Sequence, residues 1–376
     1  MYFLPYILVF FFLVFIVLFA PITVKDKSIH TNINKDLIVL QFLLLFFLWI
    51  YFVCFREYVY IDWVSYKRLF DSVRPFSEIE GYWKVNTNQW ERGYYVFCCL
   101  VKQFTDNYLV FQVINGLIDA FCIFLLFKQY YSNRYFCLAV CFFYIFNGLP
   151  IEFNLLRNSK AIFIFLFSLK YLGEKKYLKY LLLNIAATQL HNSAIIYIFI
   201  TPFLLFNWTT KRVILFLFVV GNFLYLLQID LFTIVVQCIQ GFLPSSLQSV
   251  VPLFFRYKND AAYGLKIGYI ERLFTFFIIY KYKPNILRLK NGRILLNSYY
   301  IYYFNYLFFA PLVTICERIG VLFSFSYWIL YPYIYSQLKS KDKKYLFWGI
   351  FIIYGALKLY VANNSETFQY RNILTL

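Results

Sequence analysis

Residues 37–55 read LIVLQFLLLFFLWIYFVCF, an apolar run that contains no charge and a single amide, Gln41. A helix of this length crosses the roughly 30 Å of hydrocarbon in a bilayer. Further apolar runs of roughly 14–22 residues, the length that a crossing helix needs, follow along the chain between short charged segments. Transmembrane β-strands would be about half as long and would alternate in polarity, which these runs do not. The pattern predicts an all-α integral membrane protein.

The composition indicates the same fold class. Of 376 residues, 62% are hydrophobic and 14% are charged, and Phe and Tyr occur 48 and 37 times. One soluble core could not bury so much apolar surface, so lipid must cover part of it. No internal repeat, Gly/Ser linker or low-complexity tract divides the chain, and we interpret residues 1–376 as a single polytopic membrane domain. The eight cysteines form no CxxC pair and are interpreted as hydrophobic packing residues.

About twelve transmembrane helices are expected. The first apolar run lacks a basic leader and a small-residue cleavage site, and a second span follows it, so we interpret it as a retained anchor. The predicted spans are residues 2–24, 37–55, 107–127, 135–150, 159–172, 177–191, 193–206, 213–230, 267–283, 295–316, 319–338 and 345–362.

The net charge of +18 is a signal of membrane topology, not of nucleic-acid binding. Six connections hold 20 Lys or Arg and four acids, and they alternate with the other connections. The positive-inside rule therefore assigns all six to the cytoplasm. They are residues 24–36, 128–134, 170–179, 207–212, 281–293 and 339–344.

Two long loops, 56–106 and 231–266, are then expected outside the cytoplasm together with both termini. The segment from Gly93 to Phe104 in the first loop is too short to cross the bilayer and carries Lys102 near its end. We expect it to lie flat on the outer membrane surface as an interfacial helix.

Unusual polar residues gather on that outer side. Asp62 and Glu91 lie in the first long loop, each beside aromatic residues that could stack on sugars or anchor the chain at the interface. Either acid could also be simply solvated.

Arg157 begins an apolar run on the outer side. A guanidinium opposes the helix dipole there, which indicates a bound anion such as a phosphate, although pairing with Glu152 is an alternative. Arg318, beside Glu317, lies at another outer turn and could instead pair internally or snorkel.

His191 closes a polar stripe with Asn184 and Thr188 at helical spacing. Polar groups inside a span usually face a cavity or a partner helix. The stripe therefore predicts either a site residue at His191 or a hydrogen bond between helices. The chain has no GxxxxGK[ST], GxGxxG or HExxH motif, so nucleotide hydrolysis and zinc proteolysis lack their usual residues.

The order of these features resembles the EpsG-like family of Wzy-type polysaccharide polymerases. The resemblance covers roughly residues 37–340 and rests on five segments: Asp62-Trp-x-x-Tyr66, Glu91-Arg92-Gly93-Tyr94, Arg157-Asn-Ser-Lys-Ala161, His191-Asn-Ser-Ala194 and Glu317-Arg318. Asn158 and Lys160 depart from the small residues usual around that arginine.

The resemblance implies a GT-C-like, metal-independent glycosyltransferase without a cofactor, in the bacterial cytoplasmic membrane with its active site outside. It would join undecaprenyl-diphosphate-linked oligosaccharide repeat units into an O-antigen, capsule or exopolysaccharide. Its partners would be the lipid-linked glycan, the bilayer, and a chain-length regulator or flippase. The implied roles are catalytic for Asp62, Glu91 and His191, diphosphate binding for Arg157 and Arg318, and secondary for Arg92 and Asn192.

Two other classes remain open. A lipid-linked oligosaccharide flippase or other transporter would also have about twelve spans, and Asp119 with Asn115, or Glu271 with Arg272, could be its intramembrane polar residues. A glycan-modifying acyltransferase or a ligase would alter or attach the polymer without changing its length.

Overall fold

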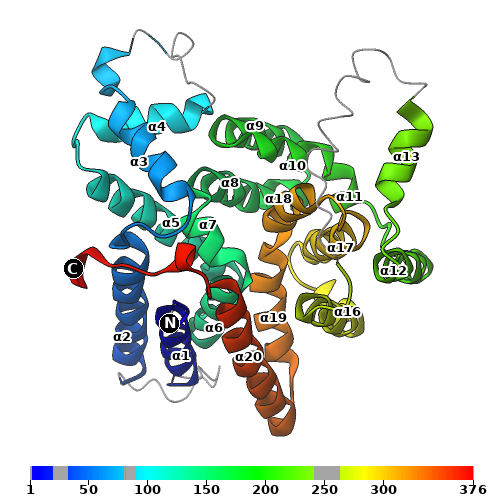
Figure 1. The fold of residues 1–376 in the computed structure, drawn as a ribbon. Helices are drawn as coiled ribbons and strands as arrows, with labels where there is room; N and C mark the ends of the chain where they lie inside the picture. The colour runs from blue at the N-terminus through cyan, green and yellow to red at the C-terminus, as the bar shows by residue number, and fades with distance from the viewer. Residues whose placement is uncertain (1, 20–32, 80, 82–89, 241–262, 376) are drawn as a thin grey trace. The chain divides into compact units, whose positions relative to one another are not determined.

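The computed structural model describes residues 2–19, 33–79, 81, 90–240 and 263–375, and these are almost entirely helical (Figure 1). Within that part of the chain, the only extended pairing recorded is an isolated antiparallel bridge between Arg56 and Asn372. The predicted all-α fold class is therefore confirmed. Residues 24–32, which hold basic residues of the first charged connection, lie outside the described residues. So do residues 241–262, which make up most of the second long loop.

Four described helices are long and apolar enough to cross a membrane, or five if the broken pair Val313–Phe323 and Phe325–Gln337 counts as one span. The four are Leu37–Cys54, Tyr108–Tyr130, Arg134–Phe153 and Lys341–Ala362, and a shorter apolar helix covers Leu4–Phe19. These helices are those of a membrane-embedded protein.

Several of the other predicted spans are shorter in the structure. The helix α9 (Tyr177–Leu190) has 14 residues and rises roughly 21 Å, less than the hydrocarbon thickness. The predicted span 193–206 contains two helices of five residues each, α10 (Ile195–Phe199) and α11 (Thr201–Leu205). The number of twelve spans therefore stays a prediction.

The described helices divide into two compact units, residues 1–198 with 327–376 and residues 199–326. The first unit contains α1 (Leu4–Phe19), α2 (Ile33–Trp49), α3 (Asp62–Ser72), α4 (Arg92–Lys102), α5 (Tyr108–Tyr130), α6 (Asn133–Phe143), α7 (Leu149–Phe153), α8 (Leu156–Gly173), α9, most of α10, most of α19 (Phe325–Gln337) and α20 (Lys341–Ala362). The second contains α11, α12 (Lys211–Leu226), α13 (Leu231–Gln240), α16 (Ile267–Ile286), α17 (Gly292–Phe308) and α18 (Val313–Phe323).

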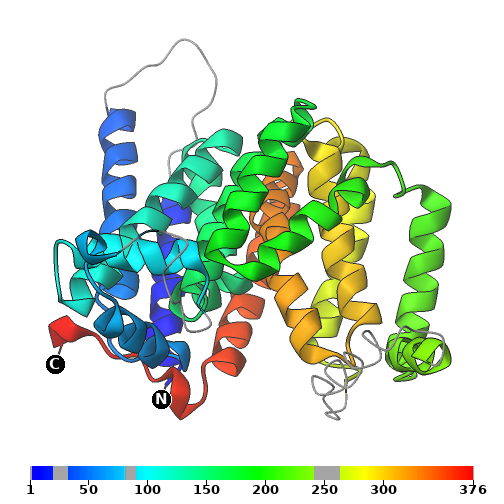
Figure 2. The same cartoon turned by 90° about the horizontal axis from the view of Figure 1, so that it is seen from above.

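Two bundles of helices organise the first unit. The apolar helix α1 packs against α2, α6 and α20, and α8 packs along α9 (Figures 1 and 2). The first long loop folds as α3 and α4, which pack on α5. Their buried residues form one apolar cluster: Tyr66, Leu69, Phe70, Tyr94, Cys98 and Phe111. The segment expected to be an interfacial helix is thus α4, which buries one face on this cluster.

The chain breaks between α6 and α8, and the break positions the candidate site. A π-helical turn at Tyr144–Gly148 contains Asn147 with φ 66°, and Pro150 lies in the first turn of α7. Proline is favoured in a first helical turn, where its missing N–H has no partner to lose. Within the π-helical turn, the carbonyl of Phe146 accepts a hydrogen bond from Trp328 Nε1 at 2.6 Å. The helix α8 starts only after this interruption, at Leu156.

Candidate functional site

Arg157, on the first turn of α8, lies at the centre of a polar cluster. Its guanidinium forms an ion pair with Glu91 and lies over the ring of Trp90, 4.5 Å from the ring centroid. It also interacts with the Tyr66 hydroxyl. The side chain of Arg157 is 24% exposed, and its Nε is buried without a hydrogen-bond partner among the described residues. The pairing expected as an alternative, with Glu152, is wrong, because the ion-pair partner is Glu91.

Glu91 connects three segments that are far apart in the sequence. It is the N-cap residue of α4, and its carboxylate is 5% exposed. His191 Nδ1 and the Asn192 backbone N–H each donate to Oε1 at 3.1 Å, while Arg157 binds Oε2. Burial alone raises the pKa of Glu91. The His191 hydrogen bond, the charge of Arg157 and the Asn192 N–H outweigh burial and hold the pKa at about 2.

A close backbone approach makes this contact geometrically feasible. A Cβ atom at Gly93 would lie 2.7 Å from the carbonyl oxygen of Gln189, a separation at which something must shift. Glycine therefore lets the start of α4 reach the end of α9. His191 terminates α9 in an extended conformation, with φ −157° and ψ 124°, and the Asn192–Ala194 turn follows.

The predicted polar stripe on α9 divides between two roles. Asn184 is buried and donates to Ser168 Oγ of α8 at 2.9 Å, which is a structural hydrogen bond between helices. Thr188 donates to the carbonyl of Ile185 in its own helix. His191 alone reaches the cluster around Arg157.

Asp62 begins α3 and belongs to the same region of the first unit. Its backbone N–H donates to Asn154 Oδ1 at 3.0 Å, and the Tyr66 hydroxyl donates to the Asn154 carbonyl at 3.3 Å. Asn154 lies between α7 and α8, three residues before Arg157, so it fixes the start of α3 near that arginine. Burial raises the pKa of Asp62, and the charge of Arg157 offsets part of that rise. The pKa of Asp62 is therefore nearer to neutral pH than that of Glu91, as a general base requires.

The structure assembles Glu91, Arg157 and His191, with the backbone of Asn192, into one cluster. Arg92 is the first residue of α4, and the side chain of Asn192 is exposed. Arg318 is exposed on α18 and belongs to the second unit. Sequence reasoning missed the roles of Asn154 and Gly93, because neither side chain carries a charge. Gly93 belongs to the Glu91–Tyr94 segment of the resemblance, but that segment does not reveal which backbone the glycine approaches.

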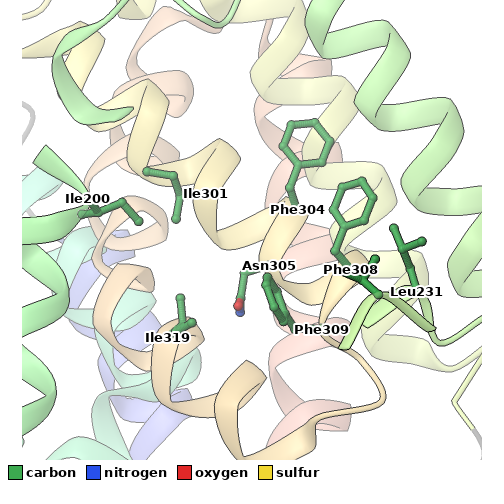
Figure 3. Close-up of a pocket in the computed structure, with 9 residues that line it drawn as sticks. Ile200, Leu231, Ile301, Phe304, Asn305, Phe308, Phe309 and Ile319 are labelled. Atoms are coloured by element: carbon green, nitrogen blue, oxygen red, sulfur yellow. The ribbon is translucent and has the colours of Figure 1, made fainter. Parts of the chain in front are cut away.

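The second unit holds a separate cavity of about 420 Å³ (Figure 3). Among the described residues that line it, Asn305 is the one with a polar side chain, and Asn305 Nδ2 donates to the Cys316 carbonyl at 2.9 Å. The other lining residues are Ile200, Leu231, Val235, Ile301, Phe304, Phe308, Phe309 and Ile319. Such walls suit an apolar ligand rather than a charged one.

These features define a helical membrane protein with an Arg–Glu–His cluster built on short helices next to its apolar spans. A scan of family models finds the EpsG family over residues 39–372, nearly the whole chain. The chain belongs to the EpsG family, a family of Wzy-like polymerases. No curated protein and no solved structure matches it.

Proposed function

We propose that the chain joins undecaprenyl-diphosphate-linked oligosaccharide repeat units into a surface polysaccharide, on the outer side of the bacterial cytoplasmic membrane. In this proposal it is a GT-C-like protein with about twelve spans that works without a metal ion. The EpsG membership supports a glycosyltransferase-like polymerase. The observation that carries the site is the convergence of Glu91, Arg157 and His191 from three distant segments.

In the proposed reaction, an acceptor sugar hydroxyl attacks the anomeric carbon of the donor. The new glycosidic C–O bond forms as the bond to the lipid-linked diphosphate breaks, and the hydroxyl proton passes to a carboxylate. Asp62 is the proposed base, because burial raises its pKa while Glu91 is held as a low-pKa carboxylate by its three partners.

Arg157 is the proposed diphosphate contact. Its side chain is partly exposed, and the contacts with Trp90 and Glu91 fix the plane of the guanidinium. Its remaining donors would therefore be oriented before a phosphate arrives. His191 would add a second donor beside it, and Arg318 is a further candidate for the leaving diphosphate. Glu91 then positions the two basic side chains and does not act as a base.

A flippase or transporter remains the second candidate. The observation that favours it is the ion pair of Asp119 and Lys160, 0% and 11% exposed and joined at 2.6 Å. Asp119 lies on α5, a helix long and apolar enough to cross a membrane. Charged groups inside spans often mark substrate or ion pathways in transporters.

The test is a gel ladder of surface polysaccharide from a deletion strain complemented with wild type, Arg157→Ala or Arg288→Ala. Arg288 is an exposed arginine outside the candidate site and serves as the matched control. We expect deletion to leave single repeat units, and wild type and Arg288→Ala to restore the ladder. Arg157→Ala should insert normally and fail to restore it. A ladder unchanged by deletion would refute polymerisation, and repeat units stranded inside would favour the flippase.

A further inference from the structure

The cavity of the second unit contains a hydrogen-bond acceptor that lacks a donor. Asn305, on α17, is 6% exposed and lines the cavity of about 420 Å³ with apolar side chains that come mainly from α13, α17 and α18 (Figure 3). Its Oδ1 is buried and receives no hydrogen bond from a described residue. A buried acceptor without a donor costs free energy, so this atom indicates a ligand that donates.

The orientation of the Asn305 amide is fixed by a neighbour on α18. Its Nδ2 donates to the Cys316 carbonyl at 2.9 Å. The reverse orientation would place Oδ1 against that carbonyl oxygen, and two acceptors repel each other. Figure 3 shows the amide among the lining side chains, between Ile319 and Phe309. The oxygen is therefore the atom of this amide that is left for a ligand.

Water is a poor partner for this acceptor. A buried water molecule usually makes about two to four hydrogen bonds to polar groups. Among the described residues that line the cavity, Asn305 alone has a polar side chain. An apolar cavity of about 150 Å³ stays dry and binds benzene, and this cavity is larger. It therefore suits a mostly apolar ligand that carries one donor.

Membrane lipid is the source of such a ligand. Leu231 and Val235 of α13 line the cavity and are 40% and 46% exposed, so its accessible edge is apolar. In the same unit, α12 exposes Phe216 and Val219, as helices that contact lipid do. A lipid chain can therefore reach the cavity without passing through water.

The lone acceptor selects among membrane molecules. A phosphate or carboxylate accepts hydrogen bonds and would repel Oδ1, and a plain acyl or prenyl chain has no donor. A sugar has several hydroxyls, most of which the apolar walls would leave unpaired. An alcohol with a long apolar body, such as a diacylglycerol or a long-chain alcohol, matches both the walls and the acceptor. The lipid-linked diphosphate of the proposed reaction does not.

We propose that the second unit binds a membrane lipid alcohol, with its apolar chain in the cavity and its hydroxyl donating to Asn305 Oδ1. The bound lipid contacts α13, α17 and α18 at once, so its binding stabilises the packing of these helices. The site is separate from the proposed polymerisation, because neither Glu91, Arg157 nor His191 lines the cavity.

Photoaffinity labelling of the full-length protein in phosphatidylcholine liposomes tests the proposal. One probe is a long-chain alcohol with a diazirine in its chain, and the other is its methyl ether, which lacks the donor. Mass spectrometry of the labelled peptides locates each probe. We expect the alcohol to label the cavity residues of α13, α17 or α18 at a mole fraction about fivefold lower than the ether does, as one hydrogen bond gives. Equal labelling by both probes, or labelling that maps outside the cavity, would overturn the proposal.

Two variants separate the hydrogen bond from the cavity. Asn305→Leu replaces the amide by an apolar group of similar size, and should abolish the preference for the alcohol while the ether still labels. Ile301→Trp should fill the cavity and prevent labelling by both probes. The control Val219→Trp adds a similar bulk at an exposed position of α12 and should behave as wild type. A preference that survives Asn305→Leu, or wild-type labelling of Ile301→Trp, contradicts the proposed site.

Thermal unfolding of the wild type is a second readout, and it still decides if loss of the bond to Cys316 prevents Asn305→Leu from folding. A ligand that binds only the folded protein raises the Tm, so the alcohol should raise it more than the ether does. The same Tm with both probes would refute the hydrogen bond to Asn305. Neither measurement requires glycan polymerisation, so this proposal and the proposed function can fail independently.

Discussion

Replacing Glu91 by Gln removes the charge on which Arg157, His191 and the Asn192 N–H converge. The pKa of Glu91 lies at about 2 against an ordinary 4.5. A tenfold change in proton affinity corresponds to about 1.4 kcal/mol, so the surroundings stabilise the carboxylate by about 3 kcal/mol. Arg157 is 24% exposed and keeps part of its hydration in the variant. We therefore expect Glu91→Gln to lower the free energy of unfolding by about 2 kcal/mol.

Thermal unfolding of the full-length protein in detergent measures this effect. In domains of about 150–250 residues, a loss of about 2 kcal/mol lowers the Tm by roughly 4–8 °C, and we take this as the scale of the effect. Because the folded-state pKa is depressed, the stabilisation is present above about pH 4.5 and is lost as the pH falls towards 2. The difference between wild type and variant should therefore shrink in acid. The control Glu366→Gln should match wild type throughout, since Glu366 is exposed.

Two results would refute this reasoning. The first is a Glu91→Gln variant as stable as wild type at pH 7, which would mean that the three contacts contribute no net stabilisation. The second is a difference that does not change with pH, which would assign the effect to side-chain shape and not to charge.

Three further changes test the geometry of the site. Gly93→Ala should destabilise the protein by about 1–3 kcal/mol, because its Cβ would meet Gln189, and should therefore lower both the Tm and the polymer length. Gly349→Ala, which has open space at its Cβ, is the control in the same melting and ladder assays. Asp62→Asn should abolish the ladder with little change in Tm, and wild-type activity should rise with pH through the raised pKa of Asp62, as a pH profile of polymer yield would reveal. Arg157→Lys keeps the charge but loses the planar stack on Trp90, and we expect on the order of a tenfold loss of polymerising activity at an unchanged protein level.

The apolar runs predicted the long helices well, because lipid imposes a length that sequence alone reveals. The predicted spans 107–127 and 345–362 correspond to α5 and α20. The runs did not reveal where a helix breaks inside an apolar stretch. The π-helical turn before α7 depends on Asn147 and Pro150 together with the tertiary hydrogen bond from Trp328, and this last contact is 182 residues away.

Charge counts along the chain predict that Glu91, Arg157 and His191 lie on one side of the membrane, and the structure brings these three side chains together. Their actual partners could not be predicted. Arg157 has Glu152 five residues before it, yet it binds Glu91. The carboxyl oxygens of Glu152 have no hydrogen-bond partner among the described residues. Such choices depend on packing between helices, to which sequence spacing gives no access.

The cluster around Glu91 also constrains how the protein is made. Glu91 emerges from the ribosome well before Arg157, and both precede His191, so the carboxylate has no partner until α8 and α9 follow. Since chains fold from the N-terminus during synthesis, the first long loop cannot reach its final arrangement on its own. Nascent chains that stop before residue 192 should therefore leave this loop sensitive to protease, and chains that extend beyond α9 should protect it.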